Sequence, residues 1–207
     1  MTTIVNPWFS VWTKPRSTIR QIVDSDPKRL TLLLICLVGI GSALDQMSKA
    51  NVGDTLSIPV IFLIAAILGP IASIITWYIS AYLLKWTGGW LKGQANLVNI
   101  RTAMAWSYIP MVVILMLWIP MIAIFGGELF TTETPNMDGN QGLAMALIGF
   151  AVVQAVLTIW CLIVYLKMLG EVQGFSAWKA LGNSLLAGLI IAIPVVAIAI
   201  GVGMITG

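Results

Sequence analysis

Long stretches without a charged residue alternate along the chain with short polar segments. The uncharged stretches lie between Arg29 and Asp45, Asp54 and Lys85, Arg101 and Glu128, Asp138 and Lys167, and from Lys179 to Gly207. A bilayer hydrocarbon core of about 30 Å needs roughly 20 helical residues, and the last four stretches exceed that length. The pattern therefore predicts an all-α fold, a polytopic membrane bundle of five transmembrane helices.

The predicted spans cover about residues 29–47, 58–84, 102–126, 142–167 and 180–205, within a membrane domain of residues 27–207. The first uncharged stretch is too short for a full span, so we expect its helix to continue through Asp45 and Gln46. Asp26 followed by Pro27 has the pattern of an N-cap and a first-turn proline. This pattern predicts that the first span starts there.

Composition agrees with a membrane protein. Hydrophobic residues make up 59% of the 207 residues and charged residues 9%, whereas soluble domains have roughly 45–50% and 25%. The net charge of +3 does not call for a nucleic-acid partner, because the positions of the basic residues are explained by membrane topology.

Basic residues concentrate in alternate polar segments. Ten of the eleven lie in the N-terminal leader and in the second and fourth predicted loops: Lys14, Arg16, Arg20, Lys28, Arg29, Lys85, Lys92, Arg101, Lys167 and Lys179. The remaining one, Lys49, lies in the first loop, and the third loop is acidic. Basic loops stay in the cytosol, so we expect the N terminus in the cytosol and the C terminus outside.

Residues 1–26 form a basic leader in which we expect an interfacial amphipathic helix. Its apolar residues are Trp8, Phe9, Trp12, Ile19 and Ile22, and the last two share a face opposite Arg16 and Arg20. Such a segment is typical of a helix that lies in the headgroup layer. The alternative is a soluble helix packed on the cytosolic loops, and we favour the interface.

The later part of the chain contains a possible internal repeat. Trp77 and Tyr82 recur as Trp160 and Tyr165, and Ile109-Pro110 recurs as Ile193-Pro194. Spans two and three would then form one helical hairpin, and spans four and five a parallel copy of it. Chance matching in so apolar a sequence is the alternative.

Several residues inside the predicted spans suggest where helices bend or pack. Pro70, Pro110 and Pro194 remove backbone hydrogen bonds, so we expect kinks at these positions. A small-residue ridge on span two consists of Ala65, Gly69, Ser73, Thr76 and Ser80. Because small side chains let helices approach closely, we interpret this ridge first as a packing surface and only second as part of a solute path.

Polar side chains inside spans four and five are Gln154, Thr158 and Asn183. A buried glutamine is costly in lipid, so we expect Gln154 to face protein, with span two as its neighbour. No ionisable residue lies near the middle of a span, and the chain has no histidine. Proton-coupled transport and hydrolysis are therefore disfavoured, and we expect no enzyme activity, no metal site and no cofactor.

The leader NPWFSVWTKPRSTIRQIVDSDPKR, the five spans, the glycine-rich second loop and the stretch MAWSYIP in span three together resemble the bacterial branch of the Yip (Ypt-interacting protein) domain family. Tyr108 and Pro110 resemble part of its signature. The resemblance covers almost the whole chain and implies a bacterial cytoplasmic membrane protein with the topology inferred above. It also suggests an ABC-type exporter as one possible partner. The Asp-Leu-Tyr-Gly-Pro motif of eukaryotic members, which contact Rab-type GTPases, has no good counterpart here, so GTPase binding is not transferred.

Two functional hypotheses follow. The leading one is a non-catalytic module that binds other membrane proteins, or a second copy, or organises lipids, through the ridge and the leader. The rival is a small pore or facilitator for lipid or an uncharged solute. Polar groups that pair with each other between helices would favour the binding module, whereas a continuous polar face shared by several spans would favour a path for a lipid or solute.

Overall fold

Five segments of the chain are long and apolar enough to cross a membrane. The computed structural model describes the backbone of residues 6–206 and the side chains of residues 6–194 and Val196. The spans are α3 (Thr31–Lys49), α4 (Ile58–Trp90), α5 (Leu97–Ser107) followed by α6 (Ile109–Phe125), α8 (Gln141–Gln173) and α9 (Ala177–Thr206). The predicted all-α fold with five spans is confirmed, and α3 does continue through Asp45 and Gln46.

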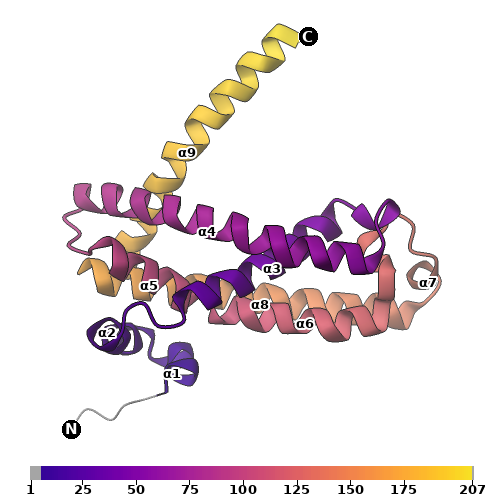
Figure 1. The fold of residues 1–207 in the computed structure, drawn as a ribbon, viewed down its shortest axis with the longest axis horizontal. Coiled ribbons are helices and arrows are strands. Elements are labelled where there is room, and N and C mark those ends of the chain that lie inside the picture. The colour runs from indigo at the N-terminus through magenta and orange to yellow at the C-terminus, as the bar shows by residue number, and fades with distance from the viewer. Residues whose placement is uncertain (1–5, 207) are drawn as a thin grey trace.

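Short elements join the spans at two opposite ends of the bundle (Figure 1). At one end lie α1 (Pro7–Thr13), α2 (Pro15–Ser25) and the turns at residues 91–96 and 174–176. At the other end lie the short helices η1 (Val52–Asp54), η2 (Gly126–Phe130) and α7 (Pro135–Asp138). The first end carries most of the basic residues and the second most of the acidic loop residues, and we call them the basic end and the acidic end.

Helices α3 and α4 pair closely, and α6 packs against α3 and α8. Helix α5 contacts α3, α4 and α8, while α9 contacts α4 and α8 near the basic end. Beyond that contact α9 leaves the bundle at an angle to the other helices (Figure 1). At about 1.5 Å per residue, α4 and α8, with 33 residues each, are roughly 50 Å long and extend past a hydrocarbon core.

The leader packs on protein more than the sequence suggests. Ile19 is fully buried and Ile22 is 4% exposed, and α2 contacts α8 and α5. Arg20 forms an ion pair with Glu171 of α8. The Ile19 and Ile22 face of α2 is therefore covered by α5 and α8 and not by lipid, and the interfacial position of the leader as a whole stays a prediction. Phe9, in α1, is 76% exposed and remains available to the headgroup layer.

The first span starts later than Asp26-Pro27 predicts. Asp26 ends α2, and its side chain accepts a hydrogen bond from the Lys28 amide at 3.1 Å. Leu30, with φ of 55°, turns the chain into α3 in a left-handed conformation that is unusual for a branched residue. The Trp106 indole of α5 donates to the Arg29 carbonyl at 3.2 Å. This bond helps hold the turn, which could not be inferred from local sequence.

The possible internal repeat receives mixed support. Helices α4 and α8 have the same length, and their bounds differ by 83 positions at both ends. The matched side chains, however, lie in different surroundings: Trp77 is 7% exposed and Trp160 39% exposed. Tyr82 is 61% exposed, whereas Tyr165 is partly buried. The repeat stays a prediction.

Candidate functional site

The small-residue ridge of α4 meets α3 at a close backbone contact. A Cβ atom added to Gly69 would lie 2.5 Å from the Gly39 carbonyl oxygen, which is too close for any real side chain. Ala65 is fully buried beside this crossing, and the Ser73 hydroxyl donates to the Ile35 carbonyl of α3 at 3.0 Å. This part of the ridge therefore packs inside the chain, against a partner that the sequence did not identify.

The proline positions differ in their effect. Tyr108 and Pro110 lie where span three breaks: α5 ends at Ser107, and Pro110 occupies the first turn of α6. The Tyr108 carbonyl accepts from the Met111 amide at 2.9 Å across this break. Pro70 and Pro194 lie inside the continuous helices α4 and α9. A break in span three thus places the Tyr108 ring between helices.

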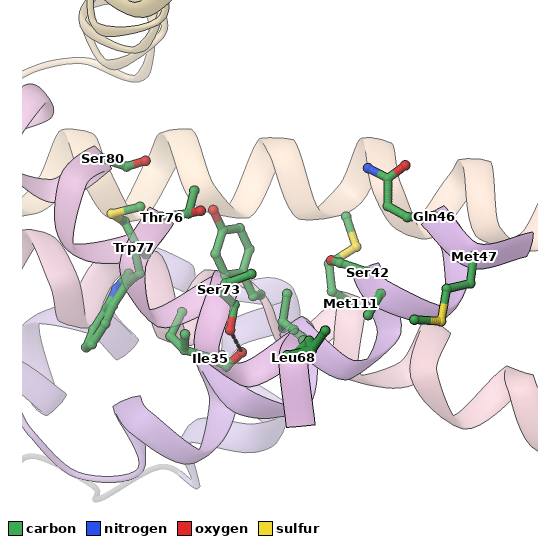
Figure 2. A pocket seen from close by; sticks show the side chains of 17 residues that line it. Ile35, Ser42, Gln46, Met47, Leu68, Ser73, Thr76, Trp77, Ser80 and Met111 are labelled. Atoms are coloured by element: carbon green, nitrogen blue, oxygen red, sulfur yellow. Dashed lines mark hydrogen bonds between the residues drawn. The ribbon is translucent and has the colours of Figure 1, made fainter. Parts of the chain in front are cut away.

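A groove of about 620 Å³ runs along α3 and α4, with the α5–α6 break at its base (Figure 2). Apolar side chains from both helices form most of its walls. The polar side chains that line it are Ser42, Gln46, Ser73, Thr76, Ser80 and Tyr108. Figure 2 shows Ser80 and Thr76 toward one end, Ser73 in the middle, and Ser42 and Gln46 toward the other end. Thr76 and Ser80 of the ridge thus face the groove and do not join the Gly69 crossing.

The polar groups of the groove lack internal partners, apart from Ser73. Within the part of the chain that the structure describes, Ser42, Gln46, Thr76, Ser80 and Tyr108 form no hydrogen bond through their side chains. Membrane hydroxyls elsewhere in the chain behave differently. Thr158 and Ser184 each donate to the carbonyl four residues earlier, at 2.8 and 2.9 Å. The groove therefore presents free donors and acceptors in a region without bulk water.

Between other helices the polar groups are paired. Asn183 is fully buried, and its amide donates to the Leu84 carbonyl at 3.1 Å. Its side-chain oxygen accepts from the Thr87 hydroxyl at 2.5 Å. Tyr165 and Ser184 share a hydrogen bond of 3.1 Å between α8 and α9. These bonds fix the first turns of α9 against α4 and α8.

Gln154 faces protein, although not the helix expected. Its amide lies 3.2 Å from the Met121 sulfur of α6, so span three is its neighbour and the expected contact with span two is wrong. Thr158 is exposed and bonds to the Gln154 carbonyl of its own helix at 2.8 Å. Contacts between spans cannot be read from the depth of a residue along its own helix.

Gln173 is a buried polar residue that the sequence did not single out. It is 2% exposed, and its side chain bonds to the Leu84 carbonyl at 3.2 Å and to the Ala95 amide at 3.4 Å. Added Cβ atoms at Gly88 or Gly93 would collide with this side chain. The glycines of the second loop thus allow the chain to wrap closely around Gln173.

Comparison with known proteins assigns the chain to a family but to no site chemistry. In the described residues, no group of three or more His, Cys, Asp or Glu side chains is placed to hold a metal ion. The chain matches no curated protein and no solved structure. The family model described as Yip1 domain matches residues 9–199, which include all the predicted site residues except Trp8. The chain therefore belongs to the Yip1 domain family.

Proposed function

We propose that the protein is a non-catalytic membrane module that binds a transmembrane helix of another membrane protein through α9. The observation that carries this proposal is that α9 is anchored at the basic end and then leaves the bundle (Figure 1). From residue 188 on, most of the described side chains of α9 are exposed, so this part of the helix leaves a packing surface free. We therefore place the interface on α9. The ridge at Gly69 and the apolar face of α2, which the sequence suggested, are covered by other helices of the same chain.

The free surface of α9 has the residues that helix association in lipid requires. A Cβ atom added at Gly188 would meet nothing within 4 Å, and Ala192, one turn later, is exposed. Leu185, Leu189 and Ile193 are 59%, 52% and 63% exposed. Because apolar surface alone does not drive association in lipid, close packing at small residues is the main source of affinity. Gly188 and Ala192 supply such a surface.

The paired polar groups also favour the module over a pore. Asn183, Thr87, Tyr165 and Ser184 bond across helices, so they do not form a polar channel through the centre of the bundle. The unpaired groups lie in a groove along α3 and α4. An ABC-type exporter and a second copy of the chain remain the candidate partners.

Leucine in place of Gly188 is expected to abolish partner recovery without loss of fold. The added side chain has room within its own chain but would push a packed partner helix away from α9. Overpacking costs about 1–3 kcal/mol, so the affinity for the partner should fall by roughly tenfold or more. Cross-linking in native membranes and mass spectrometry of the affinity-purified complex measure this. Gly149→Leu on α8 is the matched control, since Gly149 is exposed and equally open. Equal recovery from both variants would overturn the α9 interface.

The proposed topology places the basic end in the cytosol of a bacterial cell and the acidic end outside. Gly89 and Gly139 lie at the two ends, and an added Cβ at either meets nothing within 4 Å. Cysteine at Gly139 should react with an impermeant maleimide on intact cells, and cysteine at Gly89 only after permeabilisation. Both single-cysteine variants are made without Cys36 and Cys161. The reverse labelling pattern would overturn the orientation.

A further inference from the structure

We infer that the groove along α3 and α4 binds one membrane lipid, whose ester or phosphate oxygens accept hydrogen bonds from the unpaired side chains. These five side chains, the groove donors, are Ser42, Gln46, Thr76, Ser80 and Tyr108. The inference concerns a different surface from α9 and does not depend on the proposed partner.

Hydrogen-bonding chemistry is the first argument for a ligand. An unpaired hydroxyl in a hydrocarbon environment is costly, and serine or threonine on a membrane helix normally relieves that cost by bonding to a carbonyl of its own helix. Thr158 and Ser184 do so, whereas Thr76 and Ser80 do not. The groove donors are thus free to bond to an occupant that brings acceptor oxygens.

The dimensions of the groove exclude a helix as that occupant. From the crossing at Gly39 and Gly69, the lining extends seven residues along α3 to Gln46 and eleven along α4 to Ser80. At 1.5 Å per residue the groove is roughly 27 Å long. A volume of about 620 Å³ spread over this length gives a groove that is narrower than the 10–12 Å diameter of an α-helix. An extended acyl chain is narrow enough to enter.

The walls argue against a file of water molecules. A buried water needs two to four polar partners, and long segments of the lining are apolar, with Ile35, Val38, Leu68, Met104 and Met111 among them. No Asp, Glu, Lys, Arg or His lines the groove. A lipid matches both kinds of lining residue, because its acyl chain can lie along the apolar walls and its oxygens can accept hydrogen bonds from groove donors.

Gln46 lies at the end of the groove nearest the acidic end, one turn before Lys49. A lipid headgroup there would remain in the interfacial layer while its ester oxygens reach Ser42 and its chain follows α4 inward. Ser42 and Gln46 lie one turn apart on one face of α3, close enough together for the ester and phosphate oxygens of a single lipid. The groove thus has the polar mouth and apolar interior of a lipid site.

The test is photolabelling in nanodiscs of palmitoyl-oleoyl phosphatidylcholine that contain a trace of the same lipid with a diazirine in its acyl chain. We expect the label to concentrate on residues 42–47 and 72–80. The double variant Ser42→Ala, Gln46→Leu should lower labelling there by about tenfold or more, because each hydrogen bond contributes a factor of roughly five. Thr158→Val is the matched control, since this exposed hydroxyl is already bonded to its own helix.

Ala72 lines the groove and is exposed, so Ala72→Phe should block the groove and also remove the label without changing the melting temperature. Label spread evenly over α8 and the groove, or label unchanged in the double variant and in Ala72→Phe, would overturn the inference. Cross-linking of the groove to a second copy would overturn it as well. Loss of partner recovery by Gly188→Leu would leave the groove labelling intact, so the two proposals can fail separately.

Discussion

Leucine in place of Gly69 is expected to separate α3 from α4 and to lower the thermal stability of the protein in detergent. Even a Cβ atom at this position would lie 2.5 Å from the Gly39 carbonyl oxygen and 3.0 Å from the Ile40 amide nitrogen. Backbone atoms cannot rotate away as a flexible side chain can. We therefore expect a cost at or above the upper end of the typical 1–3 kcal/mol for overpacking. Thermal unfolding of the purified protein, followed by circular dichroism, measures the loss.

Leucine in place of Val60 is the control for this substitution. Val60 lies on the same helix and is 39% exposed, and lipid accommodates either side chain. Alanine at Gly39 should reproduce the Gly69 defect from the other side of the contact, because an added Cβ there collides with the Gly69 carbonyl and the Ser73 hydroxyl. If Gly69→Leu unfolded at the temperature of Val60→Leu, the close crossing would be wrong.

The spans could be predicted from the sequence because the bilayer imposes a simple rule. A helix that crosses the hydrocarbon core must be about 20 residues long and nearly free of charge. All of α6 and the greater part of α4, α8 and α9 fall within stretches that satisfy this rule. Spacing also identified Gly69 as a close-packing position. It did not identify Gly39, because the pattern of one helix says that a neighbour can approach but not which one.

The leader shows a second limit of prediction from the hydrophobic pattern, which does not say what covers an apolar face. Ile19 and Ile22 form an apolar face, and such a face predicts only that something covers it. Lipid and protein satisfy that requirement equally well. The α2 face is covered by α5 and α8, an outcome set by contacts between segments more than 70 residues apart in the sequence.

Only some of the residues that line the groove could be predicted from the sequence. Thr76 and Ser80 were recognised as polar positions of α4, but the ridge placed them with Gly69 on one surface. Ser42 and Gln46 repeat at a spacing of four on α3, which signals a shared helix face. Their position opposite α4 depends on the Gly39 crossing, and so the groove required the structure.

Replacement of Asn183 is expected to have the second large effect, because this side chain ties α9 to α4. It is fully buried and bonds to both Thr87 and the Leu84 carbonyl. Asn183→Leu keeps the branched shape of the side chain but removes the amide donor to the Leu84 carbonyl and the interhelical acceptor of the Thr87 hydroxyl. Removal of one partner from a buried hydrogen bond costs about 1–3 kcal/mol. We expect a lower melting temperature and weaker protection of α9 from hydrogen exchange.

A double-mutant cycle separates the bond from the packing around it. Thr87→Val alone should also destabilise, because it leaves the Asn183 oxygen without a donor. The variant that carries both substitutions leaves neither partner unpaired, so its loss should be smaller than the sum of the two single losses by about 0.5–3 kcal/mol, the range found for groups in contact. Additive losses would mean that Thr87 and Asn183 stabilise the protein independently. In that case the bond from the Asn183 amide to the Leu84 carbonyl, and not the bond to Thr87, would tie α9 to α4.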